Sequence, residues 1–336
     1  MLQTLPVDSV QCVVTSPPYW GLRDYGVAGQ IGLESSPEEY VSNLVDVFRA
    51  VRRVLSADGS LWLNLGDSYT DSGRGDDIGS TLQGTRRNQR ESRRTRVRES
   101  MRTRLRPKNL LMMPARVALA LQADGWWVRE DIIWAKPNPM PESVTDRCTR
   151  AHEYLFHLAK SERYYHDAAA IAEPLLPTSR DRLSQDVDHQ TGSARANGGA
   201  KRNGPMRAVG GTRKRSGNLK RDLPTGRDGR GIPNDHLGRG VPWEDTTGKR
   251  NARSVWLIGT QSYAGAHFAT FPEELARRCI VAGSRPGDTV LDPFGGSGTV
   301  AQVATGNGRN SIYIDLNPKY LELARHRIGP MLCEVA

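Results

Sequence analysis

Residues 289–299 read Thr-Val-Leu-Asp-Pro-Phe-Gly-Gly-Ser-Gly-Thr. The first three of them are typical of a short buried strand, and a helical apolar pattern follows the last. The glycines between let the backbone turn tightly and approach a ligand without a Cβ in the way. A second apolar strand, at 311–314, ends at Asp315, 19 residues after Gly296. This order of strand, glycine loop, helix and strand predicts an α/β unit that binds a nucleoside at the loop.

A second strand followed by a turn lies near the N-terminus. The apolar run Val10 to Val14 predicts a buried strand, and Thr15-Ser-Pro-Pro-Tyr-Trp20 follows it. The two prolines fix φ and stiffen the turn. Such an elbow can hold a planar base, because the Ser16 hydroxyl and the Pro17 carbonyl can accept hydrogen bonds from an amino group while Tyr19 stacks on the ring. The alternative is a plain Pro-Pro turn plugged by an aromatic ring.

Strands and helices alternate through the rest of the chain. The apolar spacing predicts helices at 37–55, 110–123, 272–282, 299–304 and 318–327. It predicts further strands at 60–65, 127–134, 154–159 and 255–258, with a turn at Asp58-Gly59. The alternation favours an α/β fold with a mostly parallel sheet.

Positive charge is concentrated in two segments. The net charge is +10, which favours a polyanionic partner. Residues 86–106 hold ten arginines and two glutamates, and residues 195–253 hold 15 lysines and arginines and five carboxylates. Neither segment has enough apolar residues for a core, so we expect insertions that neutralise phosphates; for residues 86–106 the alternative is a disordered, solvated run of charges. Candidate contacts are Arg86, Arg93, Arg94, Arg213, Lys214 and Arg215.

Other classes of protein are disfavoured by what the chain lacks. Its cysteines have no metal-ligand spacing and its aspartates between 67 and 77 have no calcium-loop spacing, so no metal site is expected. A signal peptide is not seen, and no apolar run is long enough to span a bilayer. We therefore expect a cytoplasmic protein without a membrane partner.

The glycine loop by itself leaves the cofactor open. Gly296, Gly298 and Ala301 also fit G-x-G-x-x-A, so a nicotinamide dinucleotide is about as well supported there as another nucleoside. However, the loop lies near the C-terminal end, which leaves little room for a second nucleotide-binding half. Asp292 could pair with a cationic amino group, and S-adenosylmethionine carries one beside its ribose and adenine. Asp315 would either accept hydrogen bonds from the ribose or cap the helix that follows it.

The elbow and the glycine loop together resemble the catalytic and cofactor motifs of the amino-group DNA methyltransferases. The elbow comes first, with 276 positions from Ser16 to Asp292, and this order resembles the permuted β class of that family. His267-Phe-Ala-Thr-Phe-Pro272 resembles a further cofactor segment, with Phe268 in place of a proline. Trp134-Ala-Lys-Pro-Asn138 resembles a segment beside the target-base pocket. The resemblance spans the chain except for 86–106 and most of 177–253.

The resemblance implies a Rossmann-like, circularly permuted sheet that binds S-adenosylmethionine. Residues 1–176 and 254–336 would form the catalytic domain, with a basic insertion at 68–108, and 177–253 would form the target-recognition region. The implied reaction is methylation of a base amino group in double-stranded DNA after base flipping. Ser at the first motif position usually accompanies N4-cytosine methylation, and Asp accompanies N6-adenine methylation. Ser16 therefore indicates N4-cytosine; N6-adenine and a non-catalytic DNA-binding protein are the alternatives.

The resemblance also implies roles for particular residues. The catalytic residues would be Ser16, Pro17, Pro18 and Tyr19. Those that hold the cofactor would be His267, Phe268, Thr270, Asp292, Phe294, Gly296, Ser297, Gly298, Thr299 and Asp315. DNA would contact Trp20, Lys136 and Asn138 besides the basic residues named above. Whether a restriction endonuclease accompanies the chain, and whether it acts as a monomer or a homodimer, stay open.

Overall fold

The computed structural model describes residues 1–70, 105–175, 249–261 and 271–329. The chain divides into two compact units, Met1–Ile171 with Ala252–Ala336, and Ala172–Asn251. In the second unit the described residues pair as a short antiparallel ribbon of β5 (Glu173–Pro174) and β6 (Lys249–Arg250). Within the described ranges, no helix combines the length and the apolar character needed to cross a membrane.

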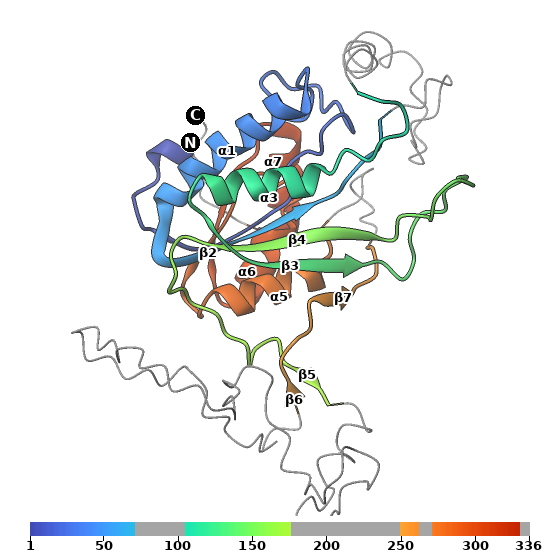
Figure 1. The fold of residues 1–336 in the computed structure, drawn as a ribbon. Coiled ribbons are helices and arrows are strands. Elements are labelled where there is room, and N and C mark those ends of the chain that lie inside the picture. Colours follow the sequence, from blue (N-terminus) through green and yellow to red (C-terminus); the bar gives the residue numbers. More distant parts are fainter. Residues whose placement is uncertain (71–104, 176–248, 262–270, 330–336) are drawn as a thin grey trace, which may run out of the picture. The chain divides into compact units, whose positions relative to one another are not determined.

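The first unit contains a seven-stranded sheet in the order β7-β3-β4-β2-β1-β8-β9 (Figure 1). Strand β4 is antiparallel to both of its neighbours, and the other four pairings are parallel. The predicted α/β fold with a mostly parallel sheet is therefore confirmed. The strands are β1 (Val10–Thr15), β2 (Leu55–Leu65), β3 (Trp127–Ala135), β4 (His152–Ala159), β7 (Val255–Leu257), β8 (Thr289–Asp292) and β9 (Asn310–Tyr313).

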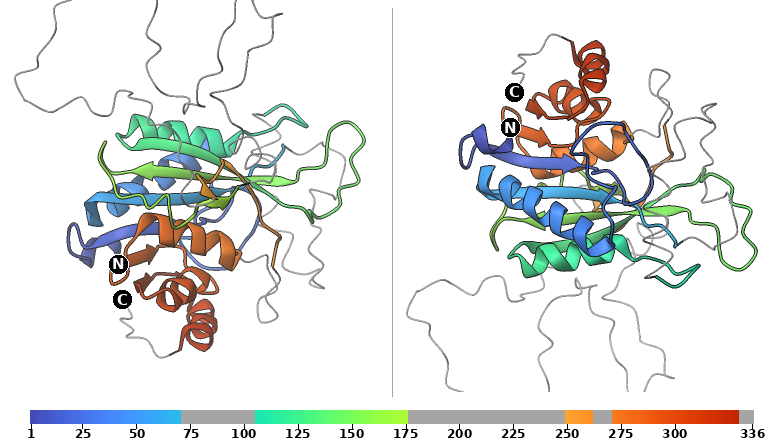
Figure 2. Two further views of the ribbon diagram at one scale, coloured as in Figure 1. Left: turned by 90° about the horizontal axis from the view of Figure 1, so that it is seen from below. Right: turned by 90° about the horizontal axis from the view of Figure 1, so that it is seen from above.

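Helices cover both faces of this sheet. Figures 1 and 2 show α1 (Pro37–Val54) and α3 (Met113–Ala123) on one face, with α5 (Glu273–Gly283) and α6 (Thr299–Gly306) on the other. Val13 of β1 packs in the core beneath α1 and α3, whereas Cys12 and Val14 pack beneath α5 and α6. Because both faces of β1 are buried, the three consecutive residues Cys12, Val13 and Val14 are all apolar instead of alternating with polar ones. A short 3-10 helix, η1 (Leu2–Thr4), precedes β1, and α7 (Pro318–Ile328) follows β9.

The start of α1 follows from its sequence. Pro37 occupies the first turn, where a missing N–H costs nothing, and the Ser36 hydroxyl accepts from Glu39 N at 3.2 Å. Glu38 and Glu39 lie at the positive end of the helix dipole. This predicted helix is confirmed to within one residue at its C-terminal end.

Two local predictions were wrong. No turn separates α1 from β2 at Asp58-Gly59, because β2 already begins at Leu55. The pairing of β1 with β2 shifts register between Val10 and Cys12, and this bulge absorbs the extra residues. The helix predicted from residue 110 begins at Met113 instead, since Leu110 forms an isolated bridge with Tyr69.

The sheet topology brings several segments to one edge. Strands β1, β8 and β9 are parallel, so the elbow, the glycine loop and Asp315 all follow strand ends at the same side. Strand β4 runs the opposite way, so its first residues, His152 and Glu153, reach that side as well.

Candidate active site

A buried hydrogen bond joins the elbow to the glycine loop. The Thr15 hydroxyl donates to Asp292 Oδ1 at 2.6 Å, although the two residues are 277 positions apart. Both side chains are buried, with exposed fractions of 0% and 5%. Thr15 directly precedes Ser16, and Asp292 directly precedes the loop. Since a hydrogen bond to a carboxylate is short and strong, this contact fixes the two motifs relative to each other.

Asp292 lies in a setting that disfavours its charge. Burial raises the pKa of its carboxyl to about 7, and the nearby charge of Asp315 acts in the same direction. The hydrogen bonds from Thr15 and from Phe294 N, the latter at 3.1 Å, partly oppose this shift. The carboxyl therefore changes its charge near neutral pH, and its ionised form depends on the few donors that reach it.

The three loop glycines serve different purposes. Gly298 has φ +79°, and a Cβ there would meet Ala324 of α7 at 3.0 Å. A Cβ on Gly295 would overlap the Tyr313 ring. Gly296 has φ +50°, but among the described residues a Cβ there would meet only the Phe294 carbonyl, at 3.9 Å. Packing therefore requires Gly295 and Gly298, whereas Gly296 supplies a left-handed turn beside open space where a ligand can approach.

Asp315 ties the end of β9 to the glycine loop. Its Oδ2 accepts from Gly296 N at 2.8 Å and its Oδ1 from Asn317 N at 2.7 Å. Asn317, not Asp315, caps α7, because the Asn317 side chain accepts from Lys319 N at 3.1 Å. The alternative that Asp315 is a simple helix cap is thus wrong. A carboxylate has about four lone-pair sites, and the described residues use two of them at Asp315, which leaves two for further donors.

The hydroxyls of the glycine loop accept hydrogen bonds from an arginine whose role was not predicted from the sequence. Arg327 Nη1 donates to Ser297 Oγ at 3.2 Å and to Thr299 Oγ1 at 2.9 Å, while Nη2 pairs with Glu273 at 2.8 Å. The Arg327 side chain is only 8% exposed. Because Arg327 lies in α7, these two hydrogen bonds attach Ser297 and Thr299 to that helix and stabilise the shape of the loop. His267, Phe268 and Thr270 lie outside the described residues.

A side chain of α1 stabilises the elbow through a hydrogen bond. The Tyr40 hydroxyl donates to the Pro18 carbonyl at 2.8 Å. Pro17 is buried and Ser16 is half-buried. Within the described residues the Pro17 carbonyl has no hydrogen-bond partner, so it stays able to accept. Trp20 contradicts its expected contact with DNA: it is 2% exposed, lies in the core, and donates its ring N–H to the Glu34 carbonyl at 3.0 Å.

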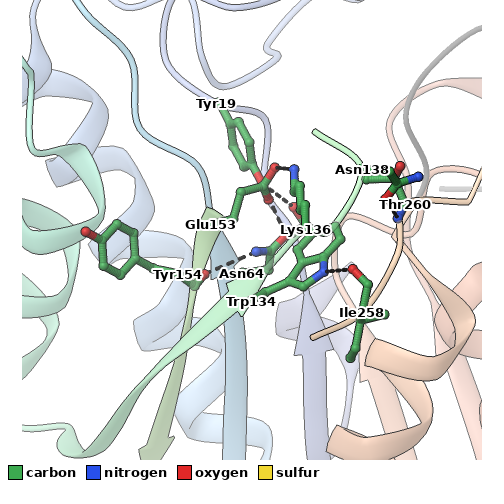
Figure 3. Close-up of polar contacts among 10 residues, drawn as sticks. Tyr19, Asn64, Trp134, Lys136, Asn138, Glu153, Tyr154, Ile258 and Thr260 are labelled. Atoms are coloured by element: carbon green, nitrogen blue, oxygen red, sulfur yellow. Dashed lines mark hydrogen bonds and ion pairs between the residues drawn. The ribbon is translucent and has the colours of Figure 1, made fainter. Parts of the chain in front are cut away.

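A polar network surrounds the hydroxyl of Tyr19 (Figure 3). It lies 2.6 Å from Glu153 Oε2 and 3.1 Å from Asn64 Oδ1, and Ser16 Oγ lies 3.5 Å away. Lys136 forms an ion pair with the other oxygen of Glu153. Burial and the negative charge of Glu153 raise the pKa of Tyr19 well above its usual value, so the phenol keeps its proton.

The ammonium of Lys136 makes its contacts with other residues of the protein. Its ammonium pairs with Glu153 and lies 4.4 Å from the centre of the Trp134 ring. The side chain is 18% exposed. Asn138 is exposed and accepts from Thr260 N at 3.2 Å, so it links two loops at this edge. Sequence reasoning found Ser16, Tyr19 and Lys136 but missed the polar residues that join them, which are Asn64 and Glu153.

Comparison with known proteins identifies the family. The profile of a DNA methylase family, named for N6 and N4 methyltransferases, matches residues 10–326. The chain belongs to this DNA methylase family. It is 40% identical over 328 residues to the type II methyltransferase M.Cfr9I of Citrobacter freundii, in a match that covers 98% of this chain and 84% of M.Cfr9I.

Solved structures of DNA methylases share the fold. PvuII DNA methyltransferase, which is cytosine-N4-specific, superposes with a TM-score of 0.57 at 17% identity over 99% of this chain and 84% of its own. A putative DNA modification methylase of Thermus thermophilus, solved with S-adenosyl-L-methionine, gives a TM-score of 0.51 at 21% identity over 98% of this chain and 88% of its own.

The DNA contacts predicted for the basic segments of this DNA methylase stay untested. Arg86, Arg93, Arg94, Arg213, Lys214 and Arg215 lie outside the described residues, as do Asp71, Asp76 and Asp77. Asp67 is described, and its carboxylate accepts from Ser68 N at 2.9 Å and Met113 N at 3.0 Å. In the part of the chain that the structure describes, no three His, Cys, Asp or Glu side chains lie close enough to hold a metal.

Proposed function

We propose that this chain transfers a methyl group from S-adenosylmethionine to the exocyclic N4 of cytosine in double-stranded DNA. The observation that supports this most is the Thr15–Asp292 hydrogen bond. It holds the elbow that would bind the base beside the loop that would bind the cofactor, which a transfer between the two requires.

The residues at the loop fit this cofactor. Gly296 leaves room for close approach, and Asp315 keeps lone pairs for the two ribose hydroxyls. Asp292 offers a carboxylate to the α-amino group of the methionine part, which would favour the ionised carboxylate. When bound, the cofactor supplies a methyl group on a positively charged sulfur.

The elbow fits an amino group of a base. The lone pair of such an amine is delocalised into the ring, so the nitrogen is a poor nucleophile. Ser16 Oγ and the Pro17 carbonyl would accept its two N–H groups and favour the tetrahedral shape that attack needs. The Tyr19 ring would stack on the base, which repays about 1–3 kcal/mol toward the few kcal/mol that flipping costs.

The choice of cytosine depends on Ser16. A Ser in this position usually accompanies N4-cytosine methylation, and the cytosine-N4-specific PvuII enzyme shares the fold. We further propose that the chain has the permuted β-class order, with target recognition in residues 177–253. The likeness to the type II M.Cfr9I is consistent with a partner restriction endonuclease.

The test is methyl transfer from labelled S-adenosylmethionine to mixed-sequence duplex DNA, followed by mass spectrometry of the digested nucleosides. N4-methylcytosine is the expected product. N6-methyladenine would overturn the choice of base while keeping the reaction, and the absence of any methylated base would overturn the proposed function.

A further inference from the structure

We propose that Glu153 is a positioning residue that orients the Tyr19 hydroxyl and receives, through Tyr19 and Ser16, the proton that the methylated amine must lose. This inference rests on the proposed function. It starts from the contacts of Tyr19 with Asn64 and Glu153 and of Glu153 with Lys136 in Figure 3, together with the Ser16–Tyr19 contact.

The hydrogen bonds of this network all donate in one direction, from Ser16 to Tyr19 and from Tyr19 to Glu153. A carboxylate only accepts, so the single proton of Tyr19 is given to Glu153 Oε2, at 2.6 Å the nearer of its two acceptors. The Asn64 amide donates its Nδ2 to the Tyr154 carbonyl at 3.1 Å, which leaves its Oδ1 toward Tyr19 as an acceptor as well. Among the described contacts of the Tyr19 oxygen, Ser16 alone can therefore donate to it.

The direction of these hydrogen bonds determines which part of the Ser16 hydroxyl is left for the base. If the Ser16 proton points to Tyr19, the lone pairs of Ser16 Oγ are left for the amino group of a bound base. The Ser16–Tyr19 separation of 3.5 Å is at the outer limit of a hydrogen bond. Catalytic hydrogen bonds are often long without substrate and shorten when it binds, so we expect the base to close this one.

Tyr19 cannot easily turn away from Glu153. Its ring packs over Gly66, where a Cβ would overlap the ring. Glu153 is held in turn by Lys136, whose ammonium donates and cannot accept. Both ends of the Tyr19–Glu153 contact are thus fixed before any substrate arrives, as a preorganised site requires.

The reaction leaves one proton to be removed. The amino nitrogen forms a bond to the methyl carbon while the carbon–sulfur bond breaks and the sulfur keeps the electron pair. The nitrogen is then positively charged and loses one proton to Ser16 Oγ, as Ser16 passes its own proton to Tyr19 and Tyr19 passes its proton to Glu153. The products are a neutral methylated amine and a neutral Glu153 carboxyl, so atoms and charge balance.

The test compares Tyr19→Phe, Glu153→Gln and the double variant in single turnovers with saturating cofactor and DNA. Each single variant should lower the rate of methyl transfer roughly 100-fold or more, because a positioned proton acceptor typically contributes about 100- to 10,000-fold. The double variant should be no slower than the slower single variant, because residues that act as one unit are not additive. Affinity for the cofactor, measured by calorimetry, should stay within about 3-fold.

Tyr40→Phe is the matched control. It removes a tyrosine hydroxyl that also bonds the elbow, at 2.8 Å from the Pro18 carbonyl, but that lies outside the Ser16–Tyr19–Glu153 path. A merely structural role of Tyr19 predicts equal losses in Tyr19→Phe and Tyr40→Phe. Equal losses, an unchanged rate in Glu153→Gln, or an additive double variant would each overturn the proposal.

A replacement variant and the product of the wild-type chain complete the test. Glu153→Gln leaves Lys136 without its ion-pair partner, so Glu153→Gln/Lys136→Met, which removes both charges, replaces it if the single variant does not fold. The wild-type chain separates the two proposals: N6-methyladenine as its product would refute cytosine while the variant rates still decide on Glu153. No product from the wild-type chain would refute both.

Discussion

Replacing Thr15 by Val tests whether the elbow and the glycine loop are joined through an ionised carboxylate. Valine keeps the shape of threonine but removes the 2.6 Å hydrogen bond to Asp292. A hydrogen bond to a charged group contributes about 1.5–3 kcal/mol to stability, whereas one between neutral groups contributes about 0.5–1.5 kcal/mol. The loss should therefore depend on the charge of Asp292.

The sign of the pH dependence follows from the raised pKa. Burial raises the pKa of Asp292 to about 7, so in the folded protein the carboxyl is mostly ionised at about pH 8 and mostly protonated at about pH 5.5. Thr15→Val should lower the free energy of unfolding by about 2–3 kcal/mol at the higher pH and by about 1 kcal/mol at the lower pH.

The assay is urea unfolding at both pH values, followed by tryptophan fluorescence, with equal m-values required for the comparison. Thr305→Val is the control, because Thr305 donates to the neutral Ala301 carbonyl at 2.9 Å. Its effect should be the same at both pH values. An equal loss in Thr15→Val at both pH values would refute the assignment of a charged acceptor.

Three further variants test the site. Ser16→Ala should slow methyl transfer about 100-fold with unchanged cofactor affinity in calorimetry, and unchanged turnover would remove Ser16 from the mechanism. Asp315→Ala should weaken cofactor binding about 10- to 100-fold, because hydrogen bonds to a charged group are lost; equal affinity would refute the role of Asp315. Gly298→Ala should lower the free energy of unfolding by about 2–3 kcal/mol, since φ is +79° and Ala324 lies 3.0 Å from the new Cβ. Gly308→Ala, with φ +74° and no contact within 4 Å, should cost only about 1–2 kcal/mol, and an equal cost in both would show that packing at Gly298 is not important.

The main elements of the fold could be predicted because their signals are local. Apolar runs marked β1 and β8, and Ser36-Pro37 marked the start of α1. Both motifs were found for the same reason, since each is contiguous in the sequence.

The residues that join the motifs could not be predicted, because their partners lie far away in the chain. Glu153 is 134 positions from Tyr19, and Arg327 is 30 from Ser297. A polar Asn64 inside the apolar run Leu61 to Leu65 was the one local signal of the network. Trp20 was assigned wrongly because an aromatic residue after a Pro-Pro turn can face either a ligand or the core, and only packing decides.

The reversed direction of β4 has a consequence for how this enzyme family can diversify. Because β3 ends and β4 begins at the edge that carries the site, residues 136–151 between them form a hairpin tip at the rim (Figure 1). Changes of length in such a tip leave both cores untouched, because the strands beneath it stay paired from Trp127 to Ala159. The tip can therefore change in length while Glu153, at the root of the hairpin, keeps its place.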